Sequence, residues 1–412
     1  MGPVRGCFGR HRQVRRQCPG ECRDGQVGRQ CGQCRCRGEA SDLAVSDLLR
    51  RLSAEHGQSP WLDNLQRSFI SGGMLRTIID SGVRGLTSNP TIFQKAIQGS
   101  ADYDEQFAAE IRRGLSPVDA YWELVISDIH GALDAFETVH RQSAGVDGYV
   151  SVEVDPSLAH DGPGTLAAAR ALDDRIDRDN VMIKIPATRE GVPAIRQMIA
   201  DGRNVNVTLI FSLDRYRDVM EAYLLGLEDR LKEGLPVEGI ASVASFFISR
   251  VDTEIDKRLD SIGTPGALAL RGTAAVNQAK LAYDSFAEVF SGPRWQTLAH
   301  LGAQVQRPLW ASTSTKNPAY PDTLYVDALI GPHTVNTLPD ATLEAFSDHG
   351  TVARTIDVGV GTARAQWDEL AVHGVNVDDV ANQLEREGVA SFIKSFEDLI
   401  SALHDKASSL GS

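Results

Sequence analysis

The sequence of 412 residues predicts an α/β protein built as a closed (β/α)8 barrel, with additional helices that include a C-terminal helix packing on the barrel. Three observations support this fold class. From residue 41 onward, short strand-like runs alternate with segments of helical spacing, which is typical of parallel sheets. Eight such runs can be counted, the number that closes this kind of barrel. Within several runs, polar residues occupy every second position.

The strand-like runs are spread over the whole chain after residue 41. They are residues 61–63, 82–88, 148–155, 181–187, 204–211, 243–249, 308–312 and 334–338. Helical spacing is clearest after Ser212, a typical N-cap, and its apolar face consists of Leu213, Tyr216, Met220, Tyr223, Leu227 and Leu231. A doubly wound sheet can use as many units, so the count alone leaves both architectures open.

The run 148–155 shows the alternation most clearly. Ser151, Glu153 and Asp155 fall on one face, and the three valines between them fall on the other. The runs that contain Lys184 and Asn206 repeat this pattern. Because helical crossovers cover the outside of a parallel barrel, the polar rows must point into its interior. Polar groups from several strands then converge on one small volume.

Lys184 lies inside the apolar run Val-Met-Ile-Lys-Ile-Pro and is the one lysine of eight within such a run. A lysine on an edge strand that extends to solvent is the ordinary structural alternative, but a closed barrel has no edge strand. Burial disfavours the ammonium form and leaves a neutral amine that can attack a carbonyl carbon. The position therefore predicts a lysine that forms a Schiff base.

Cleavage of a carbon–carbon bond through a Schiff base also needs groups that move protons. A base must take a hydroxyl proton, and an acid must help to expel water as the imine forms. Asp63 and Glu153, on two different strands, are the candidates. For each, a structural carboxylate that caps a loop or pairs with an arginine is an equal alternative. Asp63, like Asn89 and Ser312, falls at or just after the end of a strand, where barrel enzymes carry their chemistry.

Charge divides the chain at about residue 40. Residues 1–40 hold nine arginines, no lysine, three acidic residues and all six cysteines, although the whole chain carries a net charge of −13. We expect this segment to be a disordered basic arm, or an upstream extension that the mature protein lacks, ahead of a barrel domain over residues 41–412. Cys31 and Cys34 allow a zinc site as a minor alternative, which the spacing to Cys36 opposes.

Composition also limits the class of protein. No apolar stretch reaches the roughly 18 to 20 residues that span a bilayer, and the N-terminus lacks the apolar core of a signal peptide. We therefore expect a soluble, cytoplasmic protein that binds no membrane. The net negative charge argues against nonspecific binding of nucleic acid by most of the chain.

Seven motifs in the same order make the sequence resemble the transaldolase family. Residues 85–91, Gly-Leu-Thr-Ser-Asn-Pro-Thr, are similar to its Thr-Ser-Asn-Pro signature, and residues 181–186 are similar to the segment with its Schiff-base lysine. The others are Trp-Leu-Asp at 61–63, Ser-Val-Glu-Val at 151–154, Asn-Val-Thr-Leu at 206–209, Ser-Phe-Phe-Ile-Ser-Arg at 245–250 and Ala-Ser-Thr-Ser-Thr-Lys-Asn-Pro at 311–318. The resemblance spans residues 45–405 and implies a TIM barrel.

The resemblance implies a role for each matching residue. Lys184 would form the imine with C2 of a ketose, and Asp63 would accept the C4 hydroxyl proton as the C3–C4 bond breaks. Glu153 would act through a water in imine formation, and Thr208 would support both. The substrate-binding residues that it implies are Asn89, Asn206, Ser245, Phe247, Arg250, Ser312 and Lys316.

Among these residues, Asn89 and Asn206 would hold the dihydroxyacetone fragment, and Arg250 with Ser312 would bind the phosphate at the far end. In the common bacterial pattern an arginine closely follows this serine, whereas here Thr-Ser-Thr-Lys follows it. Lys316 as the replacement therefore stands beside the alternative of a solvated loop lysine.

The implied reaction moves a dihydroxyacetone unit from sedoheptulose 7-phosphate to glyceraldehyde 3-phosphate, in the non-oxidative pentose phosphate pathway. It needs no metal and no organic cofactor, because the lysine supplies the electron sink. One alternative is a simple aldolase like the fructose 6-phosphate aldolases of the same superfamily, which the carboxylate at Glu153 and the long C-terminal region oppose. Another is a binding or regulatory protein whose basic arm contacts nucleic acid.

The C-terminal segment 376–408 predicts a helix with an apolar stripe of Leu384, Phe392, Phe396, Leu399 and Leu403. The resemblance implies that this helix lies across or beside the barrel mouth, and packing against the outer helices is the alternative. Because barrels of this superfamily often pair, a homodimer is a further expectation.

Overall fold

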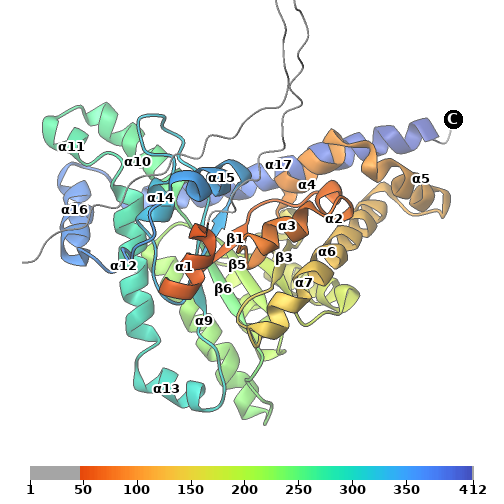
Figure 1. The fold of residues 1–412 in the computed structure, drawn as a ribbon, viewed down its shortest axis with the longest axis horizontal. Coiled ribbons are helices and arrows are strands. Elements are labelled where there is room, and N and C mark those ends of the chain that lie inside the picture. Colours follow the sequence, from red (N-terminus) through yellow and green to blue (C-terminus); the bar gives the residue numbers. More distant parts are fainter. Residues whose placement is uncertain (1–46, 411–412) are drawn as a thin grey trace, which may run out of the picture. The chain divides into compact units, whose positions relative to one another are not determined.

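The computed structural model describes residues 47–410, so the arm predicted over residues 1–40 lies outside the described residues. Within 47–410, eight parallel strands form a closed barrel in sequential order, and β8 pairs with β1 to close it (Figure 1). The strands are β1 (Gln58–Leu62), β2 (Gly85–Thr87), β3 (Val150–Glu153), β4 (Val181–Pro186), β5 (Val205–Ile210), β6 (Ser242–Phe247), β7 (Arg307–Ala311) and β8 (Thr334–Leu338). The predicted (β/α)8 barrel is confirmed, and each strand overlaps its predicted run.

Helices cover the outside of the barrel and its two ends. They are α1 (Leu48–His56), α2 (Arg67–Ser71), α3 (Met74–Asp80), α4 (Pro90–Gly99), α5 (Asp104–Arg112), α6 (Pro117–Gln142), α7 (Gly162–Ile176), α8 (Gly191–Ala200), α9 (Leu213–Lys232), α10 (Ser249–Ile262), α11 (Pro265–Ala269), α12 (Ala274–Val289), α13 (Pro293–His300), α14 (Leu324–Asp327), α15 (Asp340–His349), α16 (Val360–Val372) and α17 (Val377–Leu410), with 3-10 turns η1 (Ala101–Tyr103) and η2 (Pro156–Leu158). The helix predicted after Ser212 is α9, and the Ser212 hydroxyl accepts a hydrogen bond from Arg215 N.

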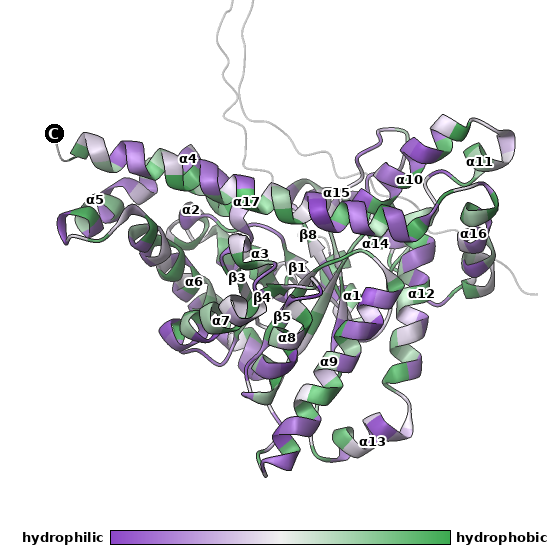
Figure 2. Cartoon of the chain, turned by 180° about the vertical axis from the view of Figure 1, so that it is seen from behind, coloured by the Kyte–Doolittle hydropathy of each residue, from purple (hydrophilic) through white to green (hydrophobic). Residues whose placement is uncertain are grey.

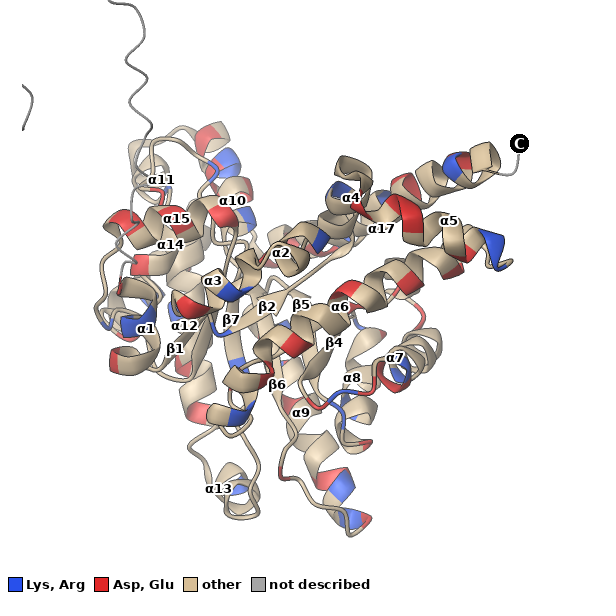
Figure 3. Ribbon diagram, turned by 45° about the vertical axis from the view of Figure 1, so that its right-hand side comes forward, with Lys and Arg blue, Asp and Glu red and all other residues tan. Residues whose placement is uncertain are grey.

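Buried strands form the inside of the barrel, and the surrounding helices carry exposed polar residues. Figure 2 shows helices in which hydrophobic and hydrophilic residues alternate, and Figure 3 shows charged residues mainly on helices and loops. Every strand residue is buried. Among the described residues, no helix has the length and apolar character that a membrane span requires.

The polar rows of three strands meet inside the barrel, as their alternation predicts. Asn206 on β5 donates a hydrogen bond from Nδ2 to Ser151 Oγ on β3 at 3.0 Å. Ser245 on β6 donates from Oγ to Asn206 Oδ1 at 2.7 Å. Because these groups satisfy one another, a polar layer can be buried there at low cost.

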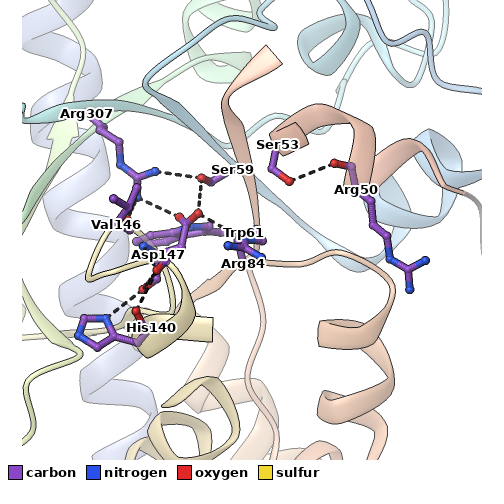
Figure 4. Close-up of polar contacts among 10 residues, drawn as sticks. Arg50, Ser53, Ser59, Trp61, Arg84, His140, Val146, Asp147 and Arg307 are labelled. Atoms are coloured by element: carbon purple, nitrogen blue, oxygen red, sulfur yellow. Dashed lines mark hydrogen bonds and ion pairs between the residues drawn. The ribbon is translucent and has the colours of Figure 1, made fainter. Parts of the chain in front are cut away.

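The N-terminal end of the barrel is closed by a buried charge cluster (Figure 4). Arg307 at the start of β7 donates to Asp147 Oδ1 at 3.1 Å and to Ser59 Oγ on β1 at 2.9 Å. Ser59 in turn donates to Asp147 Oδ2, and Arg84 lies 3.4 Å from the same carboxylate oxygen. This end of the barrel is therefore occupied by protein groups, and the opposite end is left for a ligand.

The C-terminal helix α17 crosses that opposite end, along the top of the barrel in Figure 1. Its apolar stripe is confirmed, since Leu384, Phe392, Leu399 and Leu403 are buried and Phe396 is partly buried. Thr91 on α4 and Ser395 on α17 share a hydrogen bond of 2.8 Å between their hydroxyls. The helix is thus fixed to the element that follows β2.

Candidate active site

A cavity of about 370 Å³ opens at the C-terminal ends of the strands. Nine of the eleven predicted site residues line it: Asp63, Asn89, Lys184, Thr208, Ser245, Phe247, Arg250, Ser312 and Lys316. The other two, Glu153 and Asn206, are fully part of the barrel wall and contact the lining residues Lys184 and Ser245. The structure therefore brings the whole predicted set to one place.

Lys184 occupies the centre of this arrangement. It is paired across the sheet with Glu153 on β3 and with Asn206 on β5. Its ammonium nitrogen donates to the backbone oxygen of Ser88 at 3.0 Å and lies 3.5 Å from Glu153 Oε2. Only 6% of its side chain is exposed, and Lys184 lines the cavity from within the barrel wall.

Glu153 and Thr208 each present a buried oxygen that lacks a hydrogen-bond partner among the described residues. These atoms are Glu153 Oε2 and Thr208 Oγ1, so the contact of Glu153 with Lys184 is an ion pair and not a well-formed hydrogen bond. Burial raises the pKa of Glu153, and the nearby Lys184 partly opposes this. A buried polar atom without a partner costs free energy, so these two oxygens beside the lysine are suited to hold a water or a ligand group.

The backbone beside Thr208 is strained. Leu209 has a φ of 60°, in the left-handed region, and the register between β5 and β6 shifts between Val207 and Ile210. Branched and bulky residues rarely adopt this conformation, which bends a strand locally. The irregularity falls immediately after Thr208, at the end of β5 that faces the cavity.

Asp63 follows β1 and is held by Thr87 on β2, whose hydroxyl donates to Asp63 Oδ1 at 2.8 Å. Burial raises the pKa of Asp63 above its usual range, and Lys184 and the Thr87 hydroxyl lower it in part. Its carboxylate still borders the cavity. A base at the end of one strand therefore faces the same space as the amine on another.

Asn89 combines a structural role with a free donor. Its side-chain oxygen accepts from Ile92 N at 3.0 Å and caps α4, which begins at Pro90. Its amide nitrogen makes no hydrogen bond within residues 47–410, and Asn89 lines the cavity. Capping thus fixes the side chain and leaves the amide available to a ligand.

Two cations, Arg250 and Lys316, line the cavity, and the part of the cavity around them is its cationic end. Arg250 is the second residue of α10, which follows β6, and its guanidinium lies 5.5 Å from the ring centre of Phe247. Ser312 has a φ of 58° at the end of β7 and shares a 2.9 Å hydrogen bond with Ser249. Lys316, in the loop after β7, donates to Ser314 Oγ at 2.6 Å. Burial lowers the pKa of Arg250 and of Lys316.

Sequence reasoning missed several lining residues. Lys95 and Thr91 come from α4, and Ser391 and Phe392 come from α17. Thr91 directly follows the Ser-Asn-Pro motif and Lys95 lies five residues after its proline, so their position in the chain was a usable signal. For α17, the resemblance implied a helix across or beside the barrel mouth with Phe392 in its apolar stripe, but nothing in the sequence singled out Ser391.

Comparisons with known proteins agree with this geometry. Residues 60–403 match the profile of the family described as transaldolase/fructose-6-phosphate aldolase. The chain is 50% identical to transaldolase 1 of Streptomyces coelicolor over 89% of its own length and 97% of the relative's. It is 52% identical to the transaldolase of Saccharopolyspora erythraea over 88% of this chain and 99% of the relative, and 51% identical to that of Thermobifida fusca over 85% and 96%.

Proposed function

The chain belongs to the transaldolase/fructose-6-phosphate aldolase family, and from this membership we propose how its cavity transfers a dihydroxyacetone unit through an imine on Lys184. It is an enzyme of the transaldolase type, because about half of its residues are identical to those of transaldolases over nearly their whole length. The reaction takes the unit from sedoheptulose 7-phosphate to glyceraldehyde 3-phosphate, and it yields erythrose 4-phosphate and fructose 6-phosphate.

The first half of the reaction breaks the donor. Glu153 takes a proton from the ammonium group of Lys184, the amine then attacks C2 of the ketose, and loss of water gives the imine. Asp63 takes the proton of the C4 hydroxyl, the C3–C4 bond breaks, and its electron pair moves into the protonated imine. Erythrose 4-phosphate leaves, and an enamine of dihydroxyacetone stays on the lysine.

The second half reverses these steps on a new aldehyde. C3 of the enamine attacks the aldehyde carbon of glyceraldehyde 3-phosphate, and Asp63 returns its proton to the new hydroxyl. Water then hydrolyses the imine and releases fructose 6-phosphate. Asn89 and Asn206 would hold the dihydroxyacetone hydroxyls through both halves, since Asn89 lines the cavity and Asn206 contacts its lining residue Ser245.

Imine formation and hydrolysis each need a proton carrier beside C2. Glu153 is suited to this task, because it lies beside Lys184 and burial raises its pKa. The unpartnered Glu153 Oε2 and Thr208 Oγ1 would hold the water that is lost and regained. Both atoms are on the strands that flank Lys184.

The cationic end of the cavity would bind the phosphate. Arg250 and Lys316 supply charge-assisted donors, and Ser312 supplies a hydroxyl beside them. Aldehyde and ketose phosphates of the non-oxidative pentose phosphate pathway carry their phosphate at the end remote from the reacting carbons, which suits this division of the cavity. Because sugar phosphates of this kind are soluble, we place the enzyme in the cytoplasm. We also expect a homodimer, which sedimentation would test.

The burial of Lys184 beside Glu153 within a cavity that also holds Asp63 is the observation that carries this proposal. The test is borohydride reduction in the presence of fructose 6-phosphate, followed by peptide mass spectrometry. We expect a reduced dihydroxyacetone adduct on Lys184 and none in Lys184→Met. Absence of the adduct in the wild-type chain would refute the mechanism, and net release of dihydroxyacetone without transfer would indicate an aldolase.

A further inference from the structure

The cavity wall formed by α4 carries a cation that the proposed reaction does not use. Lys95 lines the same cavity as Lys184, Arg250 and Lys316. It lies on α4, which follows β2, whereas Arg250 follows β6. Because β2 and β6 stand on opposite sides of the closed barrel, Lys95 and Arg250 approach the cavity from opposite walls.

Lys95 is also the one lysine without a polar partner among the described residues 47–410. All eight lysines lie within residues 47–410, and the other seven each have a polar partner there. Those partners are Glu153, Asp229, Glu254, Ser314, Asp398, Asp104 and the backbone oxygens of Ser88, Thr355 and Val358. Lys95 makes no ion pair and no hydrogen bond with any described residue.

Positive charge at this end of the cavity exceeds the negative charge that the described residues place beside it. Lys95 lies close enough to Lys316 to lower the pKa of the latter, in addition to the larger effects of burial and Arg250. Glu387 on α17 is near Arg250 and Asp63 is near Lys316, so two carboxylates oppose part of this charge. The three cations Lys95, Arg250 and Lys316 outnumber these carboxylates, so their repulsion favours a bound anion.

The backbone that carries Lys95 is well fixed. Asn89 caps the start of α4, and Phe93, Ala96 and Ile97 bury its inner face. Thr91 on the same helix is hydrogen-bonded to Ser395 of α17. A lysine on such a helix keeps a constant attachment point while its long side chain can extend toward a bound anion.

We propose that Lys95 is a third cation of the phosphate-binding end of the cavity, and that it contacts the substrate phosphate from the wall opposite Arg250. It would then set the preference for phosphorylated over unphosphorylated aldehydes and take no part in the proton transfers. This inference rests on the proposed function, since it assigns a further residue to the same substrate.

The test compares two acceptors at a saturating concentration of fructose 6-phosphate. For the wild-type chain and Lys95→Met, kcat/KM is measured with glyceraldehyde 3-phosphate and with glyceraldehyde. We expect the ratio of the two values to fall about tenfold in Lys95→Met, the size of one charge-assisted hydrogen bond, through KM of the phosphorylated acceptor. Inhibition by inorganic phosphate, measured with glyceraldehyde as the acceptor, should weaken by a similar factor, and Lys95→Arg should restore both.

Lys394→Met is the matched control, because Lys394 lies on α17 with 74% of its side chain exposed and pairs with Asp398. Its acceptor ratio should equal that of the wild type. An unchanged ratio in Lys95→Met, or an equal loss with both acceptors, would overturn the inference. If the wild-type chain itself neither transfers dihydroxyacetone nor forms the adduct on Lys184, the proposed function fails instead, so the two failures are distinguishable.

Discussion

Lys184 Nζ lies 3.5 Å from Glu153 Oε2, and the two residues are paired across adjacent strands of the barrel. Both side chains are almost fully buried, so bulk solvent does not hydrate either charged group. A carboxyl group in this position can exchange protons with a group bound to the lysine nitrogen directly or through one water. The pair therefore joins the nucleophile to the group that would serve imine formation.

Glu153→Gln tests this link. The amide keeps the shape of the carboxyl group but cannot transfer its proton, so we expect kcat to fall by about 10² to 10⁴-fold. Rapid mixing with borohydride should show slower formation of the adduct on Lys184. Glu190→Gln, at a half-exposed residue paired with His160, serves as the control and should react at the wild-type rate. Adduct formation at the wild-type rate in Glu153→Gln would exclude Glu153 from the step.

Asp63 should impose an acid limb on the pH dependence of cleavage. The base must be ionised, so kcat/KM should fall as the pH is lowered through the pKa of Asp63. Because burial raises this pKa, the fall should occur at a higher pH than the usual aspartate pKa of about 3.9 would give. Thr87 donates a hydrogen bond to the ionised form. Thr87→Val should therefore move this limb to higher pH. A profile of kcat/KM for fructose 6-phosphate over pH 4 to 8 checks both, and a limb that moves to lower pH would contradict the assignment.

The sequence predicted the barrel well because hydropathy and alternation reflect what the interior of a barrel requires. The polar row of β5 shows this, since Asn206 meets the neighbouring rows at Ser151 and Ser245. The first strand was predicted too short, because Gln58 and Ser59 are polar residues at buried positions. Their partners are distant in sequence, and no local pattern reveals them.

The candidate site was predicted to the extent that its residues lie on strands or in motifs. Lys95 was missed because an exposed helical lysine resembles any solvated one, and its lack of a partner is visible only in three dimensions. The left-handed Leu209 was missed for a related reason, since leucine has no sequence preference for that conformation. The course of α17 beside the cavity was expected from the resemblance to the family, with packing against the outer helices as the alternative.

Asp252 should make stability depend on pH. It is buried on α10 and accepts hydrogen bonds from Ala275 N and the Tyr325 hydroxyl, and burial raises its pKa to about 6. The pKa of Asp252 is higher in the folded state than in the unfolded state. Its protonated carboxyl group therefore contributes its full stabilisation below pH 4, and this stabilisation is lost as the pH rises through 6. Between pH 4.5 and 7.5 the free energy of unfolding of the wild type should fall by about 2 kcal/mol relative to that of Asp252→Asn. Urea unfolding at both values measures this, and a constant difference would contradict it.

Removing Arg307 should destabilise the closed end of the barrel. Burial alone would raise the pKa of Asp147, but Arg307, Ser59 and Arg84 together hold it below its usual value. Arg307→Met leaves a buried carboxylate short of its main partner, so we expect a loss of about 3 to 5 kcal/mol in the free energy of unfolding. Arg307→Met combined with Asp147→Asn should recover much of it. A double variant as unstable as the single one would show that packing, and not charge, is the cause.

Gly388 should control how closely α17 approaches the phosphate-binding end of the cavity. A Cβ atom at this position would lie 3.0 Å from Leu209 Cδ2 and 3.5 Å from Arg250 Nη1. A glycine inside a helix costs about 1 kcal/mol relative to alanine, so its presence in α17 suggests that space is the requirement. We expect Gly388→Leu to displace the Arg250 guanidinium and to raise KM for glyceraldehyde 3-phosphate about tenfold, more than it lowers kcat.

Gly361 provides the comparison for this variant, because it is a helical glycine of α16 with open space around its Cβ position. Gly361→Leu should leave KM as it is in the wild type and should not lower stability, since leucine favours helices over glycine. If Gly388→Leu changes kcat and KM for phosphorylated and unphosphorylated acceptors alike, then α17 acts on the whole cavity. A selective rise with the phosphorylated acceptor would place the effect at Arg250, because that guanidinium is the charged group nearest to the added side chain.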